Sequence, residues 1–165
     1  MRGWQERPTE EAYLLNPAFC SLILSTAVRG YVETAENEMP YLLAFLVLPV
    51  VLHKPTRSEL PRAVSTSLAS WLEEHGEITL RFPDRARSLT PFTKEAILFA
   101  VTRETLSVSL EGALSFGSTT PNTKKFLAST TDEVRDCLVK AKFVGRWFAK
   151  AGTAPTVMAL WGVAP

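Results

Sequence analysis

Hydrophobic and polar positions alternate at helical spacing over most of this chain, and the pattern predicts a mainly α-helical protein. Several predicted helices begin at a capping residue. Asn16-Pro17 and Thr90-Pro91 each place a cap before a proline, and Thr9 and Thr131 each precede acidic residues. The predicted helices cover residues 16–33, 40–52, 65–75, 90–103 and 131–151, with a brief helix at 84–89 and a further helix start at Thr9.

A second pattern predicts a small β-hairpin. Leu106–Leu110 and Ala113–Phe116 alternate apolar and small polar residues around Glu111-Gly112, which is a favoured two-residue turn. Residues 77–83 also alternate, and they fit either a strand or an irregular approach to the next helix. Residues 117–130 contain no regular pattern before Thr131, so their conformation stays open.

The strongest apolar segment lies within Pro40–Pro61. Twelve residues from Tyr41 to Leu52 are continuously apolar and include Pro49. A membrane-spanning helix needs about 20 apolar residues, so this segment predicts a buried core helix that Pro49 kinks or shortens. The sequence HKPTR (His53–Arg57) is expected to stop the helix in a turn.

Composition supports one packed domain. The 165 residues are 46% hydrophobic and 21% charged, the balance of a globular protein, so we expect a single compact domain over residues 1–165 with a loose segment at 1–8. The 18 basic residues nearly cancel the 17 acidic residues. Any basic patch must therefore be local.

The two cysteines, Cys20 and Cys137, are far apart and lie on apolar faces, so we expect buried thiols in a reducing cytoplasm. The first residues lack the apolar region of a secretory signal. These observations predict a cytoplasmic protein.

Residues 65–116 have the order helix, short helix, helix, hairpin, which is typical of a winged-helix unit. In that interpretation the helix from Thr90 would enter a DNA groove. The candidate DNA contacts are Arg85, Arg87, Lys94 and Arg103. The alternative is a protein-contact module with an ordinary solvated face, since specific DNA binding normally needs a concentrated basic surface.

Residues 131–165 contain the last long helix and an apolar tail. Basic residues alternate with aromatic ones around Arg146, Trp147 and Lys150. The helix is either buried on two sides with its cations reaching solvent or a partner-docking face. The tail, with Trp161, either folds onto the core or inserts into another subunit.

The sequence offers no recognisable catalytic or metal-binding motif. His53 and His75 each lie beside a helix end, where capping or solvation is their expected role. Nucleophile-elbow, phosphate-loop, dinucleotide and zinc-protease motifs are all missing from the sequence. We therefore predict no catalytic residues, metal, cofactor or small-molecule substrate, although a small enzyme with a noncanonical pocket around a histidine is a third hypothesis.

Four blocks of the sequence resemble a known family: EEAYLLNPAF (10–19), MPYLLAFLVLPVVLHKPTR (39–57), TPFTKEAILFA (90–100) and KAKFVGRWFAKAG (140–152). Together they are similar to the middle component of bacterial three-component ABC systems, which are Lamassu-like and contain an SMC/Rad50-type ATPase. The blocks extend over nearly the whole chain, and the HKPTR and GRWFAKAG sequences are the most specific.

The resemblance implies a non-enzymatic adaptor subunit that links the ABC ATPase to an effector in defence against phage or plasmids, with possible DNA contact and no membrane insertion. Its partner-facing positions would fall in HKPTR, GRWFAKAG and the tail. The candidate partner-binding residues are His53, Lys54, Arg57, Arg146, Trp147, Lys150 and Trp161. A free-standing winged-helix transcription regulator is the alternative function.

Overall fold

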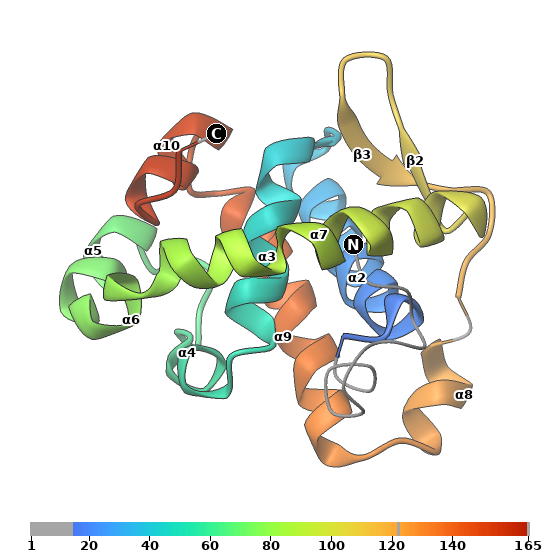
Figure 1. The fold of residues 1–165 in the computed structure, drawn as a ribbon, viewed down its shortest axis with the longest axis horizontal. Coiled ribbons are helices and arrows are strands. Elements are labelled where there is room, and N and C mark those ends of the chain that lie inside the picture. The colour runs from blue at the N-terminus through green and yellow to red at the C-terminus, as the bar shows by residue number, and fades with distance from the viewer. Residues whose placement is uncertain (1–14, 122, 165) are drawn as a thin grey trace.

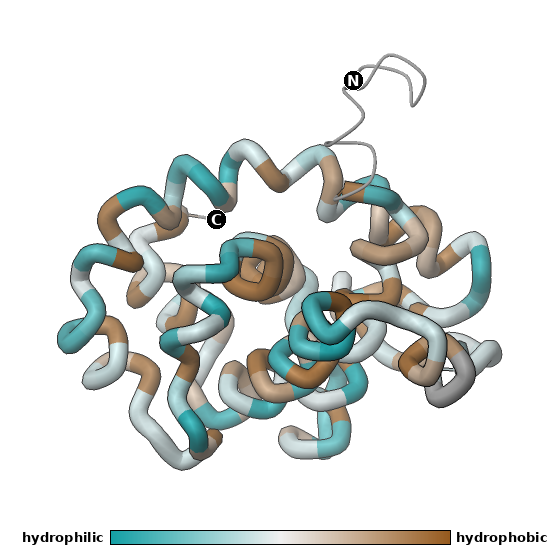
Figure 2. Tube along the Cα trace, turned by 90° about the horizontal axis from the view of Figure 1, so that it is seen from below, coloured by the Kyte–Doolittle hydropathy of each residue, from teal (hydrophilic) through white to brown (hydrophobic). Residues whose placement is uncertain are grey.

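The apolar run of the sequence forms the centre of the molecule. The computed structural model describes residues 15–121 and 123–164. In this part of the chain, α3 (Ala44–Val51) is buried almost all round, and it follows a short 3-10 helix, η2 (Tyr41–Leu43). Figure 2 looks nearly along α3, and its hydrophobic segment lies at the centre, surrounded by the other helices.

Three long helices surround α3. They are α2 (Pro17–Ala35), α7 (Phe82–Thr102) and α9 (Asp132–Phe148). α2 packs along α9, and α7 crosses over both α2 and α3 (Figure 1). The remaining helices are short: α4 (Lys54–Glu59), α5 (Leu68–Glu74), α6 (Gly76–Leu80), α8 (Thr123–Ala128) and α10 (Ala154–Leu160).

The predicted helix caps at Asn16 and Thr131 are confirmed. The Asn16 side chain accepts a hydrogen bond from the Ala18 amide at 2.8 Å, and Pro17 follows as the first helical residue. Thr131 accepts from the Val134 amide at 3.4 Å, and Asp132 and Glu133 occupy the first turn of α9. Both caps satisfy amides that the helix itself leaves without a partner. The predicted start at Thr9 and the loose segment 1–8 lie outside the described residues.

The predicted hairpin is confirmed, but the predicted two-residue turn at Glu111-Gly112 is wrong: Val108 lies opposite Leu114 and the Ser109 amide donates to the Ala113 carbonyl, so the connection is longer. Strands β2 (Leu106–Val108) and β3 (Ala113–Phe116) pair antiparallel, with Ser107 opposite Ser115. A further strand that the sequence pattern did not indicate, β1 (Met39–Pro40), pairs with the other edge of β3. The hairpin is thereby tied to the segment that enters η2.

The mainly helical fold class is confirmed, but the winged-helix interpretation of residues 65–116 is not. Helices α5, α6 and α7 precede the hairpin, but the predicted brief helix at 84–89 and the predicted boundary at Thr90-Pro91 are wrong, because α7 runs continuously through both. Pro91 lies on the exposed side of α7, so the buried residues on both sides of it pack continuously. Of the residues that the sequence left open, 77–80 belong to α6, 82–83 belong to the start of α7, and 123–128 form α8.

The crossing of α2 and α9 depends on two glycines. A Cβ atom at Gly145 would lie 1.9 Å from the Ala27 carbonyl oxygen, and one at Gly30 would lie 2.4 Å from the Lys142 carbonyl oxygen. The two backbones therefore approach more closely than any larger residue allows. This close crossing fixes the position of α9 and of the residues it carries.

Candidate partner-binding surface

HKPTR forms the start of a helix where the sequence predicted a turn. His53 is the N-cap of α4, and its Nδ1 accepts a hydrogen bond from the Thr56 amide at 3.3 Å. Thr56 is fully buried, and its hydroxyl lies 2.8 Å from the same Nδ1 and accepts a bond from Arg85 Nη2 at 3.2 Å. The hydroxyl therefore donates to His53, which places the imidazole proton on Nε2.

Arg57 lies inside the protein, with 1% of its side chain exposed. Its Nε donates to Asp136 Oδ2 at 2.6 Å, its Nη1 donates to the Val51 carbonyl at 2.7 Å, and its Nη2 pairs with Glu133. Burial opposes the charged guanidinium, but the hydrogen bonds to Asp136 and Glu133 outweigh it and raise the pKa of Arg57. Arg57 thus joins the end of α3 to the start of α9.

Neighbouring charges and burial also shift the pKa values of Glu133 and His53. The hydrogen bond from Arg57 lowers the pKa of Glu133, and Lys54 adds to this from 3.4 Å. Burial, followed by the charge of Arg85, lowers the pKa of His53. The imidazole is therefore held in its neutral, capping form.

Trp147 and Trp161 also lie in the core. The Trp147 indole donates to the Thr66 carbonyl at 2.7 Å, and its ring meets Trp71 edge-to-face at 5.4 Å. Trp161 is fully buried and packs on Phe82, with ring centroids 4.2 Å apart. Of the two alternatives for the tail, this structure has the tail folded onto the core. Arg57, Trp147 and Trp161 therefore have packing roles here, and their contact with a partner stays a prediction.

The other predicted partner residues are accessible. His53 is half-buried, and Lys54 is exposed beside Glu133. Arg146 is exposed on the last turn of α9, and Lys150 is exposed in the turn that follows α9, beside the cavity between α5, α9 and α10. The structure brings His53, Lys54 and Arg57 together at α4, beside the start of α9. Arg146 and Lys150 lie near the other end of α9.

The four predicted DNA contacts do not form one continuous surface. Arg85 is half-buried, and its Nε donates to the Pro49 carbonyl at 3.0 Å. Arg87 and Lys94 are exposed and line the same pocket. Arg103 is exposed at the end of α7, where its guanidinium lies over the Phe99 ring at 5.4 Å. DNA contact by these residues stays a prediction.

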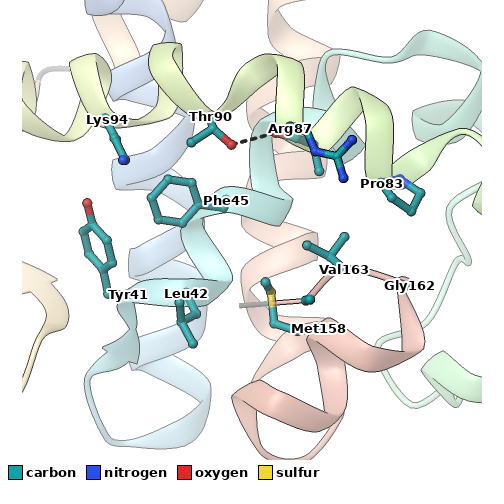
Figure 3. A pocket seen from close by; sticks show the side chains of 12 residues that line it. Tyr41, Leu42, Phe45, Pro83, Arg87, Thr90, Lys94, Met158, Gly162 and Val163 are labelled. Carbon is teal, nitrogen blue, oxygen red and sulfur yellow. Dashed lines mark hydrogen bonds between the residues drawn. The ribbon is translucent and has the colours of Figure 1, made fainter.

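The pocket beside Arg87 and Lys94 is the site that sequence reasoning missed. It has a volume of about 500 Å³ and lies between η2, α3, α7 and the end of α10 (Figure 3). Tyr41, Leu42 and Phe45 form one wall, and Met158 and Val163 form another. These segments are distant in the sequence, so only the fold brings them together.

The charged residues that line this pocket are both basic. Arg87 and Lys94 from α7 line it, and none of the described lining residues is acidic. Asp84 pairs with Arg87 at 3.4 Å from outside the lining, with both side chains highly exposed, so this pair is weak. Lys94 makes no ion pair with any described residue. The pocket is therefore an apolar concavity with a cationic rim.

The histidines and cysteines of the described chain have structural surroundings. His75 stacks on Trp71 and lies 2.8 Å from its carbonyl oxygen, and neither histidine lines the apolar pocket. Burial raises the pKa of Cys20 to about 12 and also raises that of Cys137. Among the residues that the structure describes, no group of three or more His, Cys, Asp or Glu could hold a metal ion.

Comparison with known families identifies the chain. The family model of the ABC-three component (ABC-3C) system Middle Component 3 matches residues 4–165, and the protein belongs to this family. No curated protein and no solved structure matches this chain. In the described residues, none of the helices has both the length and the apolar character needed to cross a membrane.

Proposed function

We propose that this chain is a non-enzymatic adaptor subunit that links the SMC/Rad50-type ABC ATPase of its three-component system to an effector, in cytoplasmic defence against phage or plasmids. Membership of the middle-component family supports a role among partner proteins. The observation that carries the proposal is the open apolar pocket with Arg87 and Lys94 at its rim. An exposed apolar concavity in a globular protein is typical of a binding site.

The chemistry of the described residues supports binding over catalysis. Arg57, Glu133 and Asp136 satisfy one another between α3, α4 and α9, and His53 caps a helix. Each of these groups holds the fold through these hydrogen bonds and ion pairs, and none of them lines the open apolar pocket. DNA contact within the complex remains part of the proposal through Arg103, which is exposed at the end of α7 and lies outside this pocket.

A three-way pull-down tests the linking role. The chain, the ATPase and the effector of one system are co-expressed at low salt with a tag on the ATPase, and the experiment is repeated without the chain. The proposal predicts that the effector is retained only when the chain is present. Retention of the effector without the chain, or absence of the chain from the complex, would contradict it.

A further inference from the structure

We infer that the pocket between η2, α3, α7 and α10 (the cationic pocket) binds a short segment of a partner protein in which a large apolar side chain lies beside acidic residues. This inference rests on the proposed adaptor function and specifies its contact.

The walls of the cationic pocket fit one large apolar side chain. Tyr41 and Phe45 meet edge-to-face with ring centroids 5.2 Å apart, so each ring supports the other. Both rings and Leu42 are half-buried, which leaves part of their apolar surface open to a ligand. Met158 faces them, and its unbranched thioether can adapt to different apolar groups. Burial of such a group in a well-formed pocket is the usual source of affinity at a protein interface.

The rim determines the charge of the occupant. Arg87 and Lys94 come from the same helix and border the cavity, and the Tyr41 hydroxyl points toward Lys94 from the opposite wall (Figure 3). With no acidic residue among the described lining, an inserted basic residue would be repelled and an acidic one attracted. An acidic segment also gains two possible partners that lie on one side of its apolar anchor.

The composition of the walls favours a protein segment over nucleic acid. A nucleic-acid site needs several cations along a backbone track, whereas Arg85 is turned into the protein and Arg103 lies outside the pocket lining. The apolar side chains outnumber the charged ones around the cavity. This arrangement is typical of an anchor pocket with a polar rim.

Charge reversal tests the inference in the assembled complex. Arg87→Glu with Lys94→Glu is compared with Arg62→Glu with Arg81→Glu, which makes the same change in net charge at exposed residues outside the pocket lining. We expect the pocket pair to lower co-purification of the chain with its partners about tenfold, because like charges repel, and the control pair to leave it unchanged. Thermal unfolding checks that both variants are folded.

The possible outcomes separate the two proposals. If the wild-type chain co-purifies with neither component, the adaptor function itself fails. If the wild-type chain co-purifies and the pocket pair does so equally well, only the assignment of the cationic pocket is overturned. An equal loss in both double variants would also overturn it, because the effect would then come from net charge.

Photocrosslinking identifies the occupant. Thr90 on the pocket lining is replaced by the photoreactive residue p-benzoylphenylalanine, with the exposed residue Glu77 on α6 as the control position. In the purified complex we expect the residue at position 90 to crosslink to a partner peptide that contains Asp or Glu beside a large apolar residue. A crosslink to nucleic acid, to a basic peptide or to no partner would contradict the inference.

Discussion

Arg57 donates a hydrogen bond from Nη1 to the Val51 carbonyl at 2.7 Å, at the residue where α3 ends. The last carbonyls of a helix have no partner within it and carry partial negative charge. Arg85 does the same for Pro49, with Nε 3.0 Å from its carbonyl. Two arginines therefore donate hydrogen bonds to carbonyl groups at the C-terminal end of the central apolar helix. The HKPTR sequence supplies one of these arginines.

Removal of Arg57 is expected to destabilise the protein. Arg57→Met would leave the Val51 carbonyl without this donor and remove the ion pairs to Glu133 and Asp136. Because both acids are about half exposed, we expect the free energy of unfolding to fall by about 2 kcal/mol. This is less than the 3–5 kcal/mol lost when a fully buried ion pair is broken. Urea unfolding measures the change. Lys54→Met, which removes an exposed partner of the same Glu133, should cost under about 1 kcal/mol, and equal effects would contradict the argument.

Stability should fall in acid partly through Glu133. The pKa of this carboxyl is lowered in the folded protein by Arg57, so its contribution is present above the ordinary pKa of 4.5 and is lost as the pH falls through the lowered value. Wild type should therefore lose more unfolding free energy than Glu133→Gln between pH 6 and pH 3. Denaturant titrations across this range measure both slopes, and parallel slopes would show that the pair does not hold in solution.

The α2–α9 crossing should not tolerate a methyl group. Gly145→Ala would place a Cβ 1.9 Å from the Ala27 carbonyl oxygen, and a backbone atom cannot rotate away. We expect a loss of about 3 kcal/mol, at the upper end of overpacking effects. The control is Gly76→Ala in α6, where a Cβ meets nothing within 4 Å. In thermal unfolding, the midpoint temperature of Gly76→Ala should equal or exceed that of wild type, since alanine has a higher helix propensity than glycine.

The two core tryptophans should respond differently to the same substitution. Trp147→Phe removes a buried hydrogen bond to the Thr66 carbonyl, whereas the Trp161 indole nitrogen is buried and makes no hydrogen bond within the described structure. We expect Trp147→Phe to cost about 1 kcal/mol more than Trp161→Phe, the net value of one such bond. Urea unfolding of the two variants provides the comparison. A larger loss at Trp161 would contradict the assigned environments.

Neither cysteine should react in the native protein. Both thiols are buried, and burial raises the pKa of Cys20 to about 12 and that of Cys137 in the same direction. An aromatic disulfide reagent at pH 8 should therefore label neither thiol until guanidinium unfolds the chain, and then both. Rapid labelling of the folded protein would show that one of these sites opens.

Local patterns were sufficient to predict much of the fold. The Asn16 and Thr131 caps, the core helix with Pro49 and the pairing of the two hairpin strands each depend on neighbouring residues, and the structure confirms them. The sequence predicts a helix start at Pro91 because proline is over-represented at the first position of helices. Packing of Ala86 on one side of it and Ala96 on the other carries α7 through that position.

The candidate site could not be predicted in the same way. The sequence predicts HKPTR as a turn, and the family resemblance implies that it faces a partner, but the acids that draw Arg57 inside lie on α9, far along the chain. The cationic pocket combines Phe45, Lys94 and Met158 from three distant segments. No local pattern links these residues, so only the tertiary structure reveals that they share a cavity.

Hydrogen exchange of the chain, alone and in complex with its ATPase and effector, tests the central claim most directly. An adaptor that docks through the cationic pocket should gain protection in the peptides covering residues 41–45, 83–94 and 158–164. Peptides covering α6, at residues 76–80, serve as the internal comparison. Protection confined to that comparison region, or no change in any peptide in the presence of both components, would contradict the account.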